Sequence, residues 1–403
     1  MPRRIWPGKK IPITLKLEHG KPGQVEISEH QGTLQVFEPY WSALLPATQA
    51  RVLRIFSGSK EADFYQVFRG QVIQSRPRRG IIAGTNHYAI KVKGLVYVPE
   101  HGSPVHPSLD QLFHETREDE TKGTIDFAVV DENGYRTYQP RDPAGQSFIS
   151  ADVADWETRL AVNHINRFTG RQSRVLPPLA IAKYDLTHNI TGDKLAAVAV
   201  ISYNPHDYRL TEMMRSGDPL GQVHLDSLGQ AAMALWSFHS GADRGIGEYG
   251  LGHRYASTGN IPLSSRGSRS TKIPPMYITD LEDAFELGRL ATPAQVAGHL
   301  ADDLTSLIIS SVSDVIERPM FVDEKEPKEP FPLAATIVSK YFSRIPAQPG
   351  DALRAAEEFD GLFKAKQFQR MFDTEPKMYE AFRKALEPTA ARMLASFRKN
   401  QRN

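Results

Sequence analysis

The residues with the clearest chemical potential lie in two short stretches of the chain. These are HRYASTGNIPL, residues 253–263, and ITDLEDA, residues 278–284. The first contributes an amide oxygen at Asn260, and the second contributes carboxylates at Asp280 and Glu282. Oxygen ligands of this kind are those that Mg²⁺ prefers. Phosphoryl transfer needs such ligands, a cation on the nucleotide phosphates and a group that orients the acceptor. The two stretches therefore predict a phosphoryl-transfer site.

The spacing inside the first stretch supports this interpretation. His253 and Arg254 are followed by Asn260, seven residues after the histidine. In protein kinases, the loop H-R-D-x-x-x-x-N has this spacing, with the aspartate as base and the asparagine on a metal ion. Tyr255 occupies the place of the aspartate, and a phenol with a reference pKa of about 10 is a poor base at neutral pH. We expect His253, Arg254 and Tyr255 to form the catalytic loop, with the base altered.

Residues from about 121 to 290 resemble the kinase-like superfamily. The likeness is to its atypical branches, the phosphatidylinositol-kinase-like and toxin-type Ser/Thr kinases, in the hairpin VVDENGYRTYQPRDP (129–143) and the helix that follows it. The segment DLEDA also looks like the strand end of aminoglycoside phosphotransferase-type kinases. The resemblance implies ATP and Mg²⁺ as cofactors and a helix glutamate at Glu157. It implies metal ligands at Asn260, Asp280 and Glu282.

The strand cation that should pair with Glu157 is open to two interpretations. In the preferred register, Gln139 stands where the kinase lysine is expected, which would leave the phosphates without their usual cation. In the alternative register, Lys91 in HYAIKVKG resembles the V-A-I-K strand lysine. Lys91 lies 66 residues before Glu157, so this register needs a long insertion, or Glu115 as the helix partner. The preferred register predicts Gln139 opposite Glu157 and weak ATP binding.

The order of expected elements indicates an α+β fold with a bilobal kinase-like core. A hairpin with Asn133-Gly134 at its turn precedes a helix near residues 151–168, and two apolar strands follow. In this helix Glu157, Ala161, Ile165 and Phe168 fall on one face, which we expect to be apolar. The later half is mainly helical, with Thr292 expected to cap one long helix. We expect a β-rich region over 1–120, a kinase-like N-lobe over 121–205, a helical C-lobe over 206–322 and a helical C-terminal extension over 333–403.

The composition excludes several classes of protein. The chain has 403 residues, a formal net charge of +2 and no cysteine, so disulfides and cysteine-based zinc sites are excluded. A nearly neutral chain does not favour nucleic acid as a partner. The longest apolar run, LAAVAVI (195–201), is too short to span a membrane, and the N-terminal residues do not form a signal peptide pattern. We expect a cytoplasmic protein, or one in a host cytosol if it is a secreted effector.

Other interpretations of the same residues remain open. Asn260 could be a turn residue, Asp280 could cap a helix that begins at Leu281, and His253 could be structural. With both the base aspartate and the strand lysine replaced, the chain could also be a pseudokinase that acts as a protein-interaction scaffold. The motif likeness could further be accidental in a structural protein. The acceptor, whether protein or small molecule, and the oligomeric state are not predicted.

Overall fold

The structure is a computed structural model of the whole chain. It describes residues 4–21, 24–57, 67–68, 71–72, 79–85, 88–93, 125–130, 136–142, 149–168, 173–187, 193–204, 208–215, 221–240, 250–254, 256–264, 275–290, 292–316, 331–343, 357, 383–392 and 394–395. These residues form both helices and antiparallel strands, which confirms the α+β class. No helix among them is long and apolar enough to cross a membrane. The chain divides into two compact units, residues 1–166 with 176–207, and residues 167–175 with 208–403.

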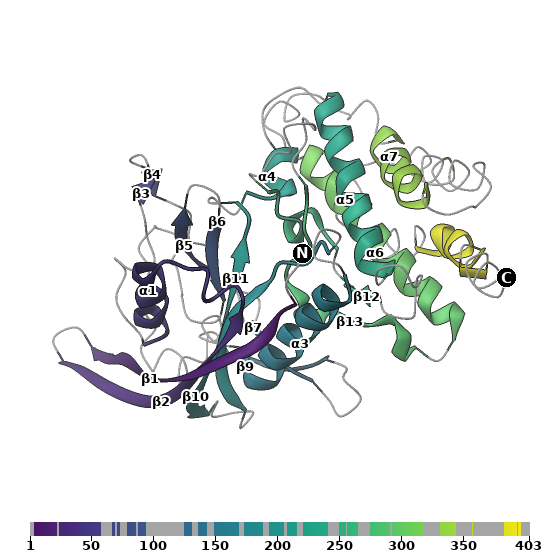
Figure 1. Cartoon of the computed structure of the whole chain (residues 1–403). Helices are drawn as coiled ribbons and strands as arrows, with labels where there is room; N and C mark the ends of the chain where they lie inside the picture. The colour runs from purple at the N-terminus through teal and green to yellow at the C-terminus, as the bar shows by residue number, and fades with distance from the viewer. Residues whose placement is uncertain are drawn as a thin grey trace. The chain divides into compact units, whose positions relative to one another are not determined.

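The first unit is built on a seven-stranded antiparallel sheet (Figure 1). Its strand order is β1 (Trp6–Lys21), β2 (Gln24–Glu38), β10 (Pro178–Thr187), β11 (Lys194–Ser202), β6 (Tyr88–Lys93), β5 (Arg79–Thr85), with β9 (Ile149–Ser150) paired to β11. The central strands are rich in alanine and β-branched residues and are buried on both faces. Because successive side chains of a strand point to opposite faces, each strand can serve two different layers.

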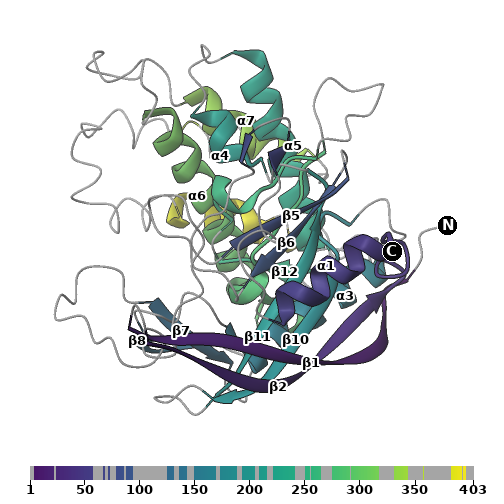
Figure 2. The ribbon, with the colours of Figure 1, turned by 90° about the vertical axis from the view of Figure 1, so that its left-hand side faces the viewer.

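Two helices cover the two faces of this sheet (Figures 1 and 2). Helix α1 (Pro46–Phe56) packs its buried Val52, Ile55 and Phe56 into the main apolar core, which also holds Ile90 and Val92 of β6. Helix α3 (Ala151–Arg167) lies on the other face. The Ser150 hydroxyl caps α3 by accepting a hydrogen bond of 3.1 Å from the Val153 amide. The face that the sequence predicted to be apolar is buried at Glu157, Ala161 and Ile165 of α3 and at Phe168 directly after the helix.

The arrangement of this unit corrects the expected domain boundaries. Strands β1, β2 and β6 lie in the same sheet as β10 and β11, so residues 1–120 do not form a region of their own. The hairpin expected around Asn133-Gly134 does form, as β7 (Ile125–Val130) and β8 (Arg136–Asp142), but it is a separate two-stranded sheet. A further short pair is β3 (Val67–Phe68) with β4 (Gln71–Val72). The turn residues Asn133 and Gly134 lie outside the described residues.

The second unit is mainly helical. Its helices are α4 (Leu210–Met214), α5 (Gln222–Ser240), α6 (Pro293–Ile316) and α7 (Phe331–Phe342). Thr292 caps α6 as predicted, because its hydroxyl accepts from the Gln295 amide at 3.2 Å and Gln295 in turn accepts from the Thr292 amide at 2.9 Å. Helix α7 belongs to the same compact unit as α5 and α6, so the expected boundary before residue 333 does not separate a further domain in the described residues.

The segment that carries the predicted chemistry lies among these helices. It contains the strands β12 (Leu251–Gly252) and β13 (Phe285–Glu286), which pair with each other, and the 3-10 turns η3 (Thr258–Asn260), η4 (Leu281–Asp283) and η5 (Leu287–Arg289). Residues 260–264 run antiparallel to residues 275–279, through an isolated bridge between Leu263 and Met276 and a bond from the Tyr277 amide to the Pro262 carbonyl. The two predicted stretches are therefore neighbours in space.

A glycine at the start of this segment allows a very close approach to α5. A Cβ on Gly250 would lie 1.7 Å from the carbonyl oxygen of His239, in the last turn of α5. Backbone atoms cannot move aside as the end of a side chain can, so we expect Gly250→Ala to destabilise the fold by about 3 kcal/mol, the upper range for overpacking. The measurement is the free energy of unfolding in denaturant.

Gly259→Ala is the matched control for this prediction. A Cβ on Gly259 would meet only the Ser257 hydroxyl, at an ordinary distance of 3.6 Å. We expect this substitution to change the free energy of unfolding by less than about 1 kcal/mol, since it creates no clash. Equal losses for the two alanine variants would contradict the close approach of Gly250 to α5.

Candidate functional site

A buried ion pair joins the sheet of the first unit to helix α3. The Lys93 ammonium on β6 lies 3.3 Å from a carboxylate oxygen of Glu157, and the two side chains are only 11% and 8% exposed. Lys93 points away from the α1 core because its neighbours Ile90 and Val92 occupy the opposite face. Two charges removed from water cost free energy that their attraction does not reliably repay. A pair buried in this way is therefore better explained by a functional role than by a contribution to stability.

This pair corrects the preferred sequence register. The strand beside β11 is β6, and Gln139 lies on β8, outside the main sheet. A lysine therefore does lie opposite Glu157, and it is Lys93. Lys91, two residues earlier on the same face, is 2% exposed and also has an interaction partner. The sequence disfavoured this strand because it lies far from the helix along the chain: Lys93 and Glu157 are 64 positions apart. The strand nevertheless meets the helix, because sheet pairing brings together segments that are distant in sequence.

A second lysine–carboxylate pair on the same helix differs in its burial. Lys183 of β10 contacts Asp155 of α3, and these side chains are 43% and 53% exposed. Exposed pairs of this type contribute little to stability. Helix α3 thus carries one exposed pair and one buried pair, which provides a matched comparison for the role of Lys93.

In the second unit, a carboxylate on α6 holds the start of the predicted catalytic loop. The Asp303 side chain accepts a 2.7 Å hydrogen bond from the His253 amide, and both residues are almost completely buried. The His253 ring lies with Nε2 2.8 Å from the carbonyl oxygen of Thr279. A carbonyl only accepts, so Nε2 carries the proton. Because His253 is buried and fully engaged, it positions the loop against the residue that precedes Asp280, and its predicted catalytic role is not supported by its exposure.

The same carboxylate belongs to a longer buried network. Nε2 of His239 lies 2.9 Å from the oxygen of Asp303 that His253 uses, and Nδ1 of His239 lies 2.5 Å from the Tyr341 hydroxyl. Burial raises the pKa of the Tyr341 phenol well above its ordinary value, and the nearby Asp303 charge adds to this effect. Tyr341 is therefore a neutral hydrogen-bonding group. The network connects α7 and α5 to the loop but exposes no reactive atom.

Backbone strain marks two of the predicted site residues. Arg254 has φ 71° and Asp280 has φ 67°, and among the described residues these are the non-glycine positions with positive φ. Such conformations cost of order 1 kcal/mol or more and persist at sites where the surroundings impose them. The Arg254 guanidinium lies 5.2 Å from the centre of the Phe285 ring, a cation–π contact. Strain at both positions supports the functional interpretation of the two stretches.

The cap interpretation of Asp280 is wrong. The segment after it forms only the 3-10 turn η4 of three residues, and the Asp280 side chain makes no capping hydrogen bond. Its left-handed backbone, with φ 67° and ψ 57°, also differs from the extended backbone usual at an N-cap. Asp280 is half-buried and has a further interaction partner.

Thr279 brings the predicted metal ligands into one neighbourhood. Its amide donates a 3.1 Å hydrogen bond to the carbonyl of Asn260, so Asn260 lies beside the residue that precedes Asp280. One amide and one carboxylate oxygen match the one or two protein ligands that Mg²⁺ takes when phosphates supply others. No group of three or more metal-binding His, Asp or Glu side chains occurs in the described residues. Glu282 is half-buried in η4, and Tyr255 lies outside the described residues.

A partly buried histidine completes the surroundings of Arg254. The His299 ring packs edge-on against Phe285, with ring centres 4.6 Å apart. Burial lowers the pKa of His299, although Asp303 opposes this shift. Phe285 is thus in contact with the guanidinium of Arg254 and the imidazole of His299. This stacking fixes the Arg254 side chain, so the residue after His253 is held through its side chain as well as its backbone.

Sequence reasoning missed the residues that hold the site in place. Lys93 was not predicted because Lys91 gave the better motif match. Asp303 and Asp314 were not predicted because they lie in an apolar helix with no motif. A signal was available: Asp303, Ser306, Ser310 and Asp314 recur at intervals of three and four residues, which places them on one face of α6. Buried polar residues on one helical face indicate a polar partner.

Comparison with known proteins gives little independent guidance. No known protein family matches the sequence, and no curated protein matches it. Among solved structures, the chain is similar to WaaP in complex with acyl carrier protein, with 13% identity and a TM-score of 0.33 over 65% of this chain and 88% of that one. This likeness is too distant to support an argument about function.

Proposed function

We propose that this chain is an atypical kinase-fold protein that binds ATP with Mg²⁺ and transfers a phosphoryl or nucleotidyl group to an acceptor. The observation that carries the proposal is the buried ion pair between Lys93 on strand β6 and Glu157 on helix α3. Active protein kinases need an ion pair of this kind, because it places the lysine on the nucleotide phosphates. The proposal concerns the reaction class and leaves the acceptor open.

The roles of the other residues follow from their chemistry. Asn260 and Asp280 would hold Mg²⁺, with Glu282 as a further carboxylate nearby, and the ion would neutralise charge on the phosphates. His253 positions the loop through Asp303 and Thr279. The strained backbone at Arg254 and Asp280 supports roles for both residues beyond packing. Phosphoryl transfer proceeds through a loose transition state, so positioning and charge contribute more than a strong base.

One feature favours a second candidate function. Tyr255 stands in the place of the base aspartate, and its phenol is a poor base at neutral pH. In this alternative, the chain is a pseudokinase that keeps the core as a protein-interaction scaffold. The Lys93–Glu157 pair supports the transferase over this alternative, because the replaced strand lysine was the other argument for a pseudokinase.

A nucleotide-binding measurement separates these functions. We expect ATP to raise the melting temperature of the purified chain, and we expect Mg²⁺ to increase that shift, because the metal bridges phosphates and protein ligands. Turnover of labelled ATP in the presence of Mg²⁺ would then distinguish the transferase from a nucleotide-binding pseudokinase. If ATP produces no shift with or without Mg²⁺, the proposed function is wrong and only the scaffold remains.

A further inference from the structure

We infer that Asp314 is a positioning residue that holds the loop bearing Asn260, and that it does so through Thr258. The consequence for Mg²⁺ rests on the proposed function, whereas the anchoring of the loop can be tested without it. Asp314 lies near the C-terminal end of α6 and is 2% exposed. It makes no contact of its own with the predicted site residues in the interactions described, so its effect must pass through the loop.

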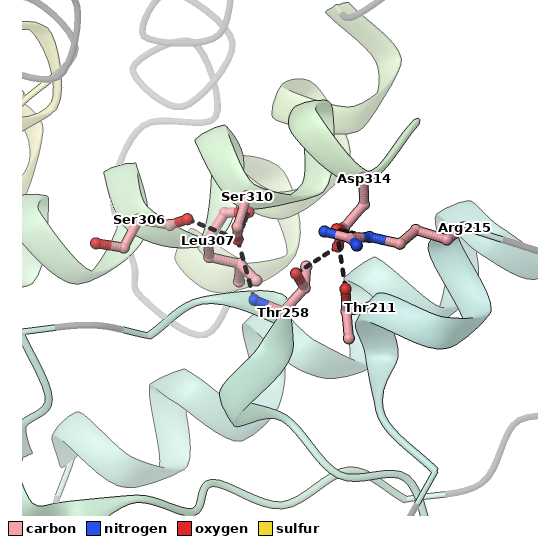
Figure 3. Close-up of polar contacts among 7 residues, drawn as sticks. All are labelled: Thr211, Arg215, Thr258, Ser306, Leu307, Ser310 and Asp314. Atoms are coloured by element: carbon pink, nitrogen blue, oxygen red, sulfur yellow. Dashed lines mark hydrogen bonds and ion pairs between the residues drawn. The ribbon is translucent and has the colours of Figure 1, made fainter. Parts of the chain in front are cut away.

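Thr258 is the residue through which α6 holds this loop (Figure 3). Its hydroxyl donates a 2.5 Å hydrogen bond to one carboxylate oxygen of Asp314, and its amide donates a 3.0 Å hydrogen bond to the Ser310 hydroxyl. Ser310 is itself directed by α6, because its hydroxyl lies 2.7 Å from the Ser306 carbonyl and 3.2 Å from that of Leu307. Side chain and backbone of Thr258 are thus both fixed to one helix.

Fixing Thr258 fixes Asn260, because the two residues begin and end the 3-10 turn η3. The Asn260 amide donates to the Ser257 carbonyl at 2.9 Å, and the Ile261 amide donates to the Thr258 carbonyl at 3.3 Å. A turn of this length has only these bonds of its own, so its orientation depends on contacts with neighbouring elements, among them those of Thr258. Arg209 supports the same turn, since its guanidinium donates to the Gly259 carbonyl.

The second oxygen of Asp314 connects the loop anchor to α4. It accepts a 2.9 Å hydrogen bond from the Thr211 hydroxyl and lies 2.8 Å from Nε of Arg215 (Figure 3). Arg215 is half exposed, so a simple surface ion pair would not require the carboxylate to be buried. The burial is explained by Thr258, which lies on the loop and needs an acceptor inside the fold. Asp314 therefore joins α4, α6 and the loop at one point.

The opposite end of the loop is held by a second carboxylate on the same helical face. Asp303 accepts from the His253 amide, and Asp314, eleven positions later on α6, accepts from Thr258. A step of eleven positions is close to three turns of an α-helix, so both carboxylates point to the same side. Helix α6 thus acts as a rigid support that sets the distance between the two ends of the segment 253–258.

Two threonines allow a matched test, because each donates its hydroxyl to Asp314 from a different element. The variants are Thr258→Val on the loop, Thr211→Val on α4 as the control, and Thr258→Ser as the rescue that keeps the hydroxyl. Hydrogen exchange of the peptide spanning residues 256–264 reports the order of η3 without any nucleotide. If Thr258→Val does not fold, Thr258→Ala takes its place, since it leaves no methyl group beside the carboxylate.

We expect Thr258→Val to increase the exchange rate of the loop amides about tenfold, while Thr258→Ser and Thr211→Val stay near the wild-type rate. We further expect Thr258→Val alone to raise the Mg²⁺ concentration for half-maximal ATP stabilisation several-fold. Equal exchange in Thr258→Val and Thr211→Val, or no change in either, would overturn the positioning role. If the wild-type chain shows no Mg²⁺-dependent ATP shift, the proposed function fails, and the exchange rates still decide whether Asp314 holds the loop.

Discussion

Lys93→Met is expected to weaken ATP binding by about ten- to hundredfold. The substitution removes the cation that is paired with Glu157 in the first unit, and a hydrogen bond to a charged group contributes about 1.5–3 kcal/mol, which corresponds to that range in Kd. Methionine keeps the length and the apolar stem of lysine, so the loss concerns charge more than packing. Calorimetric titration with ATP in the presence of Mg²⁺ measures the effect.

Lys183→Met is the control for this experiment. It makes the same chemical change in a lysine that pairs with Asp155 on the same helix, but at an exposed position. We expect ATP affinity to stay within about twofold of the wild type, because an exposed pair contributes at most about 1 kcal/mol and only to stability. A comparable loss in both variants would mean that α3 is merely displaced, and Lys93 would lose its assigned role.

Lys91 provides the comparison that tests the corrected register. It lies on the same face of β6 as Lys93 and is nearly completely buried. If Lys91→Met abolishes ATP binding while Lys93→Met retains it, the motif match was the better guide and the Lys93–Glu157 pair is structural. Gln139→Lys is expected to leave ATP affinity unchanged, because β8 is not part of the main sheet.

Asp280→Asn should abolish the part of the ATP-induced stabilisation that depends on Mg²⁺. Asparagine keeps the shape of the side chain and tolerates the left-handed backbone at φ 67°, but it removes the negative charge from a proposed metal ligand. We therefore expect a melting temperature of the free protein close to the wild type, and an ATP shift that no longer responds to Mg²⁺. Thermal unfolding with ATP at several Mg²⁺ concentrations makes the measurement.

Two further substitutions sharpen the interpretation of Asp280. Asp283→Asn makes the same change three residues later, at the end of the turn η4 that follows Asp280, and should leave the Mg²⁺ response intact. Asp280→Gly should cost the free protein no stability through its backbone, because glycine adopts positive φ without steric strain. If Asp280→Gly folds well and yet loses the Mg²⁺ response, the strained aspartate is present for metal binding and not for stability. An unchanged Mg²⁺ response in Asp280→Asn would end the metal assignment.

The sequence by itself identified the elements whose signals are local. The β7–β8 hairpin, the buried face of α3 and the Thr292 cap of α6 all formed as predicted. Each depends on residues a few positions apart, where periodicity and capping chemistry act directly. The resemblance assigned Asn260 and Asp280 to one site, and the structure adds that the segments carrying them pair through their backbones.

The tertiary structure decided which residues from distant segments meet. Lys93 reaches Glu157 because β6 pairs with β11 and α3 lies on the lysine face of that sheet. Neither motif spacing nor distance along the chain reports such pairing. The roles of Asp303 and Asp314 are also visible only in the structure, because their carboxylates accept hydrogen bonds from the loop that α6 supports. Turns, caps and helical faces depend on neighbouring residues and can be predicted from them, whereas the burial of a charge beside its partner depends on the complete fold.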